Sequence, residues 1–140
     1  MRIRGSSRDE ISKRVLAARM YGDDARKSER PAAVRFTQAY EACRMWCEIV
    51  LRAEGYLVKG STGHHERIIA AIPLYLGAQA EPIAAHLQEA RRSRNRVMYD
   101  GEIGFVTAAE TELLLETLTQ LESAVNIWLQ EKHPDLLPLV

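Results

Sequence analysis

The clearest pattern along the chain is an apolar stripe at helical spacing between Pro31 and Gly55. Its members recur every three or four residues, as on the buried face of an amphipathic helix; they are Phe36, Ala39, Tyr40, Cys43, Trp46, Cys47, Val50 and Leu51. Proline fits the first helical position because its missing N–H would be unpaired there anyway. Glycine commonly follows the last helical residue. The pattern therefore predicts a helix that begins near Pro31 and ends before Gly55.

Two further helices are indicated by the motifs at their beginnings. "SRDE" at 7–10 and "TAAE" at 107–110 have the form of capping boxes, in which a hydroxyl accepts a backbone N–H three residues later. The first motif predicts a helix to about Lys27, which Gly22 could weaken. The second predicts a helix that ends before Pro134. The apolar positions that follow the motifs are Ile11, Val15 and Leu16 in one helix and Leu114, Leu118, Leu121, Val125 and Trp128 in the other.

Two more helices are predicted in the middle of the chain. The third follows an N-cap at 61–62 and is kinked or ended by Pro73 and Gly77. The fourth begins near Pro82 and continues through a group of arginines to Tyr99. Their apolar positions are Ile68, Ile69 and Ile72, then Ile83, Leu87 and Ala90.

Signals for other structure are few. "YLVKG" at 56–60 has a short strand-like pattern, and "DGEIGF" at 100–105 predicts a turn. Five helices joined mostly by short loops predict an all-α, antiparallel up-and-down bundle. At 140 residues the chain has the size of one domain, and we expect residues 1–140 to form it, with the core in about 8–130.

The charge is balanced overall but unevenly distributed. Residues 1–99 carry 18 lysines and arginines against 11 aspartates and glutamates, whereas residues 100–140 carry 1 against 8. The acidic C-terminal segment could neutralise the basic body within the bundle, or the two could present faces to different partners. With 46% hydrophobic and 27% charged residues, the composition is that of a globular protein rather than a disordered one.

The location of the protein is inferred from three features. The first residues contain no apolar signal segment. The longest apolar run, "IIAAIPLYLGA", is 11 residues long and interrupted by proline, which is too short to span a membrane. Cys43 and Cys47 share one helix face, where a disulfide is geometrically awkward. We therefore expect a cytoplasmic protein without a membrane partner, with both cysteines as small core residues.

The strongest candidate for chemistry is "RRSRNRVMYDG" at 91–101. On a helix, Arg91 and Arg94 lie on one side, and Arg94 lies beside an apolar stripe continued by Val97 and Met98. A guanidinium at the edge of a core needs a carboxylate, a second subunit or a phosphate as partner. The alternative is that the positive charges only complement the dipole at the C-terminal end of the helix. Both explanations remain open from the residues alone.

Several segments resemble the HEPN superfamily of helical-bundle proteins. "RNRVMY" is similar to its RNxxxH signature, and "AVRFTQAYEACRMWCEIVLRAEGY" is similar to its second helix. "GSTGHHERIIAAIP", "ARRSRNRVMYDG" and "VTAAETELLLETL" follow in the family's order, so the resemblance covers about residues 8–130. It implies a homodimer whose arginine motifs face a shared cleft. Many members are metal-independent ribonucleases or toxins, and others are RNA-binding or accessory proteins that work with a nucleotidyltransferase.

Carried over by position, Arg94 and Asn95 match the family's RN pair, but Tyr99 stands where the family has histidine. Metal-free RNA cleavage needs an acid–base group with a pKa near 7. Free tyrosine, with a pKa of about 10, is only about one part in a thousand ionised at pH 7. Arginine can still bind phosphate and tyrosine can stack on a base. The resemblance therefore favours binding over cleavage.

We predict an RNA- or nucleotide-binding protein without ordinary HEPN ribonuclease activity. Enzymatic activity is therefore not the favoured prediction. The expected ligand-binding residues are Arg91, Arg94, Asn95, Tyr99 and Asp100. The first alternative is an interaction partner of a nucleotidyltransferase in a toxin–antitoxin-like or defence module. The second is a weak metal-independent ribonuclease that uses Tyr99 or a loop histidine that reaches Arg94. Catalytic residues are otherwise not identified.

No metal or cofactor is expected. The adjacent His64 and His65 point about 100° apart on a helix, so at most one of them could ligate a given metal from there. His86 and His133 show no ligand spacing. The favoured role of His65 is capping or packing at the start of the third helix. No phosphate-binding glycine loop, nucleotide fingerprint or nucleophile elbow occurs.

Overall fold

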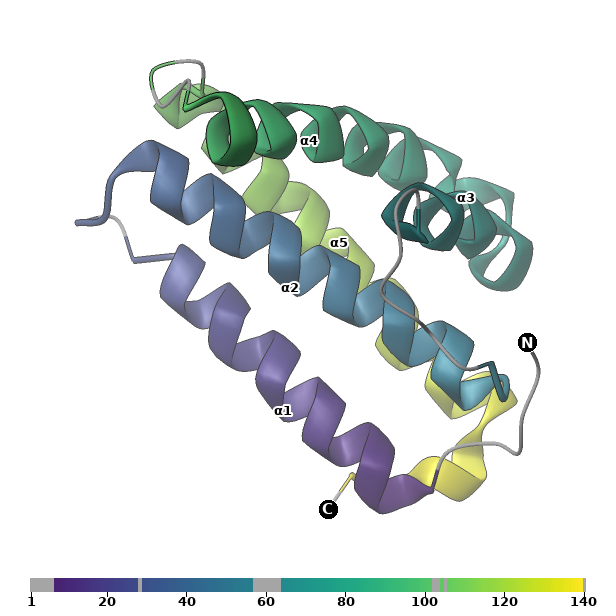
Figure 1. Ribbon diagram of the computed structural model, residues 1–140. Coiled ribbons are helices and arrows are strands. Elements are labelled where there is room, and N and C mark those ends of the chain that lie inside the picture. Colours follow the sequence, from purple (N-terminus) through teal and green to yellow (C-terminus); the bar gives the residue numbers. More distant parts are fainter. Residues whose placement is uncertain (1–6, 28, 57–63, 102–103, 105, 140) are drawn as a thin grey trace.

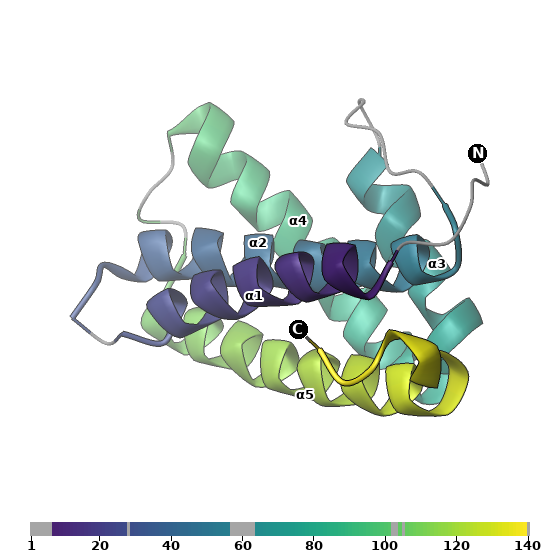
Figure 2. The same cartoon turned by 90° about the horizontal axis from the view of Figure 1, so that it is seen from below.

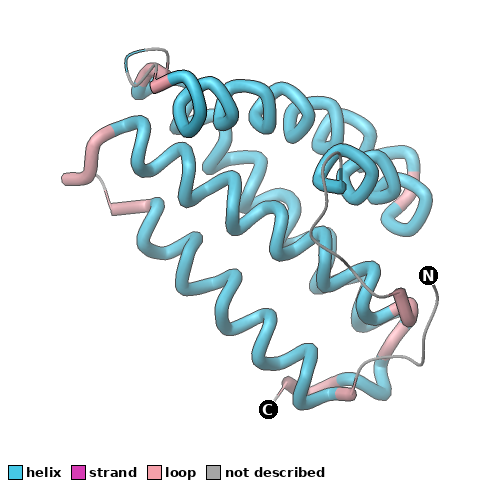
Figure 3. Tube along the Cα trace, in the orientation of Figure 1, coloured by secondary structure: helices cyan, strands magenta, loops and turns pink. Residues whose placement is uncertain are grey.

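Five α-helices make up most of the chain. The computed structural model describes residues 7–27, 29–56, 64–101, 104 and 106–139. The helices are α1 (Arg8–Ala25), α2 (Ala32–Ala53), α3 (His64–Leu76), α4 (Glu81–Asp100) and α5 (Ala108–Lys132), with short 3-10 helices η1 (Ala78–Ala80) and η3 (Pro134–Leu136). No strand occurs in the described ranges (Figure 3). The predicted all-α bundle of five helices is confirmed.

Helix α2 is the centre of the bundle. It contacts α1, α3, α4 and α5. In Figure 1, α1 lies beside α2 and runs in the opposite direction, α5 lies behind α2, and α4 runs along the top of the view, on the side of α2 away from α1. Figure 2 shows α3 standing across the long axes of α1, α2 and α5. This position requires apolar residues on more than one face of α2, and its buried residues include Ala42 and Ile49 in addition to the predicted stripe.

The predicted capping motifs are present at both helix starts. The Ser7 side chain accepts the backbone N–H of Glu10 at 3.2 Å, and the hydroxyl of Thr107 accepts that of Glu110 at 3.1 Å. These bonds satisfy donors that a helix N-terminus otherwise leaves unpaired.

The ends of α3 and α4 are determined by glycines. Helix α3 continues past Pro73 to Leu76, and Gly77 follows with a φ of 102°. Helix α4 ends before Gly101, whose φ is 68°. Only glycine adopts such positive φ values without steric cost. The predicted N-cap at 61–62, most of "YLVKG" and half of the turn at 100–105 lie outside the described residues.

The predicted core is largely correct. All predicted apolar positions in α3, α4 up to Ala90 and α5 are buried, as is the α2 stripe apart from the half-buried Leu51. Two predictions were wrong: Leu16 is 61% exposed and Met98 is 52% exposed. Leu16 follows the buried Val15, and Met98 follows the half-buried Val97. Each exposed residue is therefore rotated by one helical position from the face that neighbouring helices cover. Trp46 and Trp128 are core residues of the single chain.

Gly22 does not interrupt α1. A Cβ atom at this position would lie 3.2 Å from Cδ2 of Leu118, which is tighter than an ordinary contact. The missing side chain therefore lets α1 approach α5, and this packing offsets the low helix propensity of glycine.

Ion pairs within the molecule neutralise part of the unevenly distributed charge. Arg35 of α2 is buried, donates through Nε to the carbonyl of Ala25 at 2.9 Å, and pairs through Nη2 with Glu112 of α5 at 3.0 Å. Arg26 pairs with Glu122 of α5 at 2.5 Å. The acidic last helix thus neutralises arginines of the basic body. Among the described helices, none combines the length and apolarity needed to cross a bilayer.

Candidate functional site

Arg94 lies where α2, α3 and α4 meet, and its side chain is only 15% exposed. Its Nη2 donates to Oε1 of Glu41 on α2 at 3.0 Å. The chain itself therefore supplies a carboxylate partner. The dipole explanation is weaker than expected, because the last turn of α4 carries no basic residue and the effect fades within that turn. We name Arg94, Glu41, Arg44, Tyr40 and His65 the Arg94 cluster.

Glu41 connects Arg94 to a second arginine of the cluster. Its Oε2 accepts from Nη2 and Nε of Arg44 at 2.8 and 3.1 Å. Arg44 also pairs with Glu48, which lies 3.9 Å from Arg14 of α1. Burial disfavours the charged form of Arg44, but Glu41 and Glu48 outweigh it and raise its pKa. Among the described residues, these ion pairs connect three arginines with two glutamates, an excess of one positive charge.

The guanidinium of Arg94 also lies close to two aromatic rings. Its Cζ atom is 5.8 Å from the ring centroid of Tyr40 and 5.9 Å from that of Tyr99, within the range of cation–π attraction. Tyr40 is fully buried, whereas Tyr99 is 75% exposed. The second ring therefore presents a surface that a planar ligand group could cover.

The hydrogen bonds of Arg94 are incomplete. Nη1 makes only a long contact of 3.4 Å to Oδ1 of Asn95, and Nε is buried without a hydrogen-bond partner within the described ranges. A buried N–H without an acceptor is costly. An anion could accept from Nη1, whereas Nε has no exposed surface and would be reached only if the side chain moved.

His65 brings α3 into the cluster. Its Nδ1 lies 3.2 Å from the hydroxyl of Tyr40, and the two ring centroids are 6.1 Å apart. Burial lowers the pKa of His65, and the charges of Arg44 and Arg94 lower it further, against the opposing effect of Glu41. Burial and Glu41 raise the pKa of Tyr40. At neutral pH the site therefore contains a neutral imidazole bonded to a neutral phenol.

The other predicted ligand-binding residues occupy the same helix. Asn95 is half-buried beside Arg94, and Arg91 is half-buried and donates to Gln88 at 3.2 Å. Asp100 is exposed as the last residue of α4 and makes no contact with the cluster among the residues described. The structure thus brings Arg94, Asn95 and Tyr99 together, while the role of Asp100 stays a prediction.

Sequence reasoning missed the α2 side of the cluster. Tyr40 was interpreted only as a core residue, and Glu41 and Arg44 belong to no motif. A signal was present, because Glu41, Arg44 and Glu48 follow the three- and four-residue spacing of ion pairs on one helix face. That spacing does not reveal that Arg94 would join them from a helix far along the chain.

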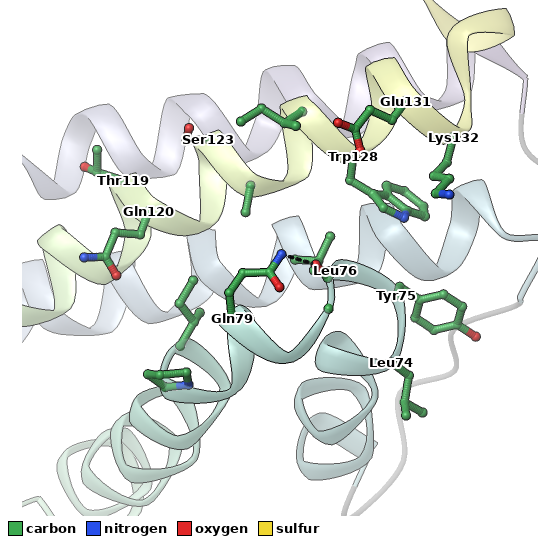
Figure 4. A pocket seen from close by; sticks show the side chains of 15 residues that line it. Leu74, Tyr75, Leu76, Gln79, Thr119, Gln120, Ser123, Trp128, Glu131 and Lys132 are labelled. Carbon is green, nitrogen blue, oxygen red and sulfur yellow. Dashed lines mark hydrogen bonds between the residues drawn. The ribbon is translucent and has the colours of Figure 1, made fainter.

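A separate groove lies between the end of α3, η1 and the start of α4 on one side and α5 on the other. Its volume is about 830 Å³. Apolar and neutral polar side chains line it, with Glu131 and Lys132 near Trp128 at one end (Figure 4). None of the predicted ligand-binding residues lines this groove. Over the described residues, no three His, Cys, Asp or Glu side chains lie together as metal ligands would.

Comparisons with known proteins do not extend this picture. No protein-family sequence profile matches the chain, and neither the curated proteins nor the solved structures contain a match to it. The HEPN resemblance therefore remains an expectation from the motifs, and the site has to be interpreted from its own chemistry.

Proposed function

We propose that the Arg94 cluster binds a phosphate group of RNA or of a nucleotide, and that Tyr99 stacks on the base. The observation that carries the proposal is the arrangement at Arg94: a largely buried guanidinium with an unsatisfied Nε lies beside an exposed aromatic ring. Arginine and an aromatic ring are the two groups that single-stranded nucleic-acid sites combine.

The charge distribution supports an anionic ligand. Glu41 compensates part of the charge of Arg94, but the connected arginines still exceed the glutamates by one. Arg91 and the exposed Arg92 add positive charge on the same helix. A phosphate at this position would accept from the guanidinium of Arg94 and neutralise the excess.

The test is to measure the affinity of a short fluorescent oligouridylate for wild type and Arg94→Ala over a range of salt concentrations. We expect the substitution to weaken binding about ten- to a hundredfold, because a hydrogen bond to a charged group contributes about 1.5–3 kcal/mol. The slope of log K against log salt should fall by about 0.7, the value for one phosphate contact on a single strand.

Two further variants separate the roles within the site. Tyr99→Ala should weaken binding, by about 1–3 kcal/mol for a lost stack, with an unchanged salt slope. Arg19→Ala removes an exposed arginine of α1 and is the matched control for net charge. If Arg94→Ala and Arg19→Ala have the same small effect, the proposed phosphate site does not exist.

A second candidate function, weak metal-independent RNA cleavage, is favoured by the position of His65. A neutral imidazole that shares Tyr40 with Arg94 could accept the 2′-OH proton next to a phosphate-binding group. A cleavage assay would compare wild type with Tyr99→His, His65→Ala and Arg94→Ala. Background-level cleavage by pure wild type excludes this function. Cleavage gained only with Tyr99→His would show that the scaffold lacks just the base.

The proposed partners follow from the resemblance and, for the nucleotidyltransferase, also from the uneven charge along the chain. A homodimer and a nucleotidyltransferase partner both stay predictions. A complex that survives Arg94→Ala would place the contact elsewhere than at this cluster, and size-exclusion chromatography with light scattering measures the number of subunits.

A further inference from the structure

His65 is the one titratable group at the Arg94 cluster whose charge can change near neutral pH. It reaches the cluster from the first turn of α3 through the 3.2 Å contact between its Nδ1 and the hydroxyl of Tyr40. The buried ring of Tyr40 in turn lies under the guanidinium of Arg94. Tyr40 therefore contacts His65 through its hydroxyl and Arg94, the proposed phosphate-binding arginine, through its ring.

The titratable and charged groups around His65 come from α2, α3 and α4. Arg44 and Glu41 act on it from α2, Arg94 acts from α4, and its neighbour His64 belongs to α3. Of these, two are cations and one is an anion. Together with burial they hold the pKa of His65 below its ordinary value of 6.5, so the imidazole of the unliganded site is neutral at pH 7.

A bound phosphodiester would reverse this balance. It adds a negative charge beside Arg94, one of the two cations that lower the pKa of His65, and a nearby negative charge favours the protonated form of a histidine. The contact with Tyr40 persists in both states. The phenol, which stays protonated, donates to Nδ1 of the neutral ring, and its oxygen accepts from the N–H of the charged ring. Protonation therefore needs no rearrangement of the packing.

We propose that His65 is a further anion-binding residue of the Arg94 cluster, one that engages phosphate in its protonated form, so that the site takes up a proton together with its ligand. This inference rests on the proposed phosphate-binding function and specifies how that site responds to pH. By linkage, affinity then rises as the pH falls, by the factor that corresponds to the increase in the pKa of His65 on binding.

The experiment measures the affinity of wild type for a short fluorescent oligouridylate between about pH 5.5 and pH 8 at constant ionic strength. A diester probe has no phosphate group that titrates in this range, so the ligand does not contribute to the slope. We expect affinity to increase about tenfold towards the acid end, which corresponds to one pKa unit. His65→Gln keeps a hydrogen-bonding group near Tyr40 but cannot be charged, and its affinity should not change with pH.

The chain offers a matched control. His86 is also half-buried, but its Nδ1 contacts the hydroxyl of Thr117 on α5 at 2.6 Å instead of the cluster. His86→Gln should therefore retain the pH dependence of wild type. Circular dichroism at each pH checks that the proteins are folded, which matters because a depressed histidine pKa contributes stability that is lost as the pH falls through it.

The outcomes separate the two proposals. Binding that is strong in wild type but independent of pH, or whose pH dependence persists in His65→Gln, overturns the role of His65 and leaves phosphate binding intact. Absence of binding at every pH overturns both. If His65→Gln does not fold, the NMR titration of the His65 ring in wild type decides: its pKa must rise when oligouridylate is added, and an unchanged value refutes the inference.

Discussion

Glu41 limits how strongly the Arg94 cluster can attract an anion, and Glu41→Gln tests this directly. The carboxylate is 18% exposed and accepts three contacts of 2.8–3.1 Å, two from Arg44 and one from Arg94. The amide keeps one acceptor oxygen and places an NH₂ group where the other oxygen was. The substitution therefore retains the shape of the site and removes one negative charge from it.

The expected changes in stability and affinity have opposite signs. Losing a hydrogen bond between charged groups costs about 1.5–3 kcal/mol, so we expect the free energy of unfolding to fall by about 2 kcal/mol. A unit charge about 6 Å from a phosphate contributes roughly 3 kcal/mol at an effective dielectric constant of 20. Screening by salt and solvent reduces this to about 1–2 kcal/mol, or roughly a tenfold gain in affinity for oligouridylate.

The assay combines urea unfolding with fluorescence anisotropy of the labelled oligouridylate. Glu48→Gln is the control, because Glu48 pairs with Arg44 and Arg14 but not with Arg94. It should lower the stability by a similar amount and change the affinity less. If Glu41→Gln is destabilised without binding more tightly, or binds more weakly, Glu41 does not compete with phosphate for Arg94 and the interpretation of the cluster is refuted.

Two further predictions concern groups outside the proposed site. Arg35→Met loses both the bond to the Ala25 carbonyl and the pair with Glu112, and urea unfolding should show a loss of about 2 kcal/mol. Glu112→Gln should cost less than about 1 kcal/mol because that carboxylate is 61% exposed; equal losses would contradict the assignment of the bond to the carbonyl. Burial raises the pKa of the Cys47 thiol to about 12 and that of Cys43 well above its ordinary value. Both thiols should therefore resist Ellman's reagent at pH 8 in the native protein and react once urea unfolds it; a thiol that reacts rapidly without urea would show that it is accessible.

The fold could be predicted because its signals are local. Apolar spacing, capping boxes and terminal glycines act within one or two turns of a helix, and the α2 stripe and both capping motifs were found as expected. The errors at Leu16 and Met98 have the same origin. Periodicity identifies a face of a helix, but the width of that face depends on which neighbours cover it, and these come from elsewhere in the chain.

The site could be predicted only from the α4 side. The four arginines at 91–96 and Tyr99 follow one another in the sequence, so their shared helix was sufficient to propose them as a group. Which arginine is buried, and against what, is not a local property. Arg94 is paired because α2 brings Glu41 to it from 53 residues away.

The sequence alone therefore determined five helices, their approximate ends and most of the buried stripe of each, because a helix forms from bonds and side-chain spacing between near neighbours. It also placed an arginine and a tyrosine, Arg94 and Tyr99, on the same helix. Only the packing of α3 and α4 on α2 decided the electrostatics of that pair. It added the carboxylate that restrains Arg94, the second arginine that shares it, and a neutral histidine joined through Tyr40. Burial and Coulomb interactions depend on distance in space, and helix crossings bring these groups together.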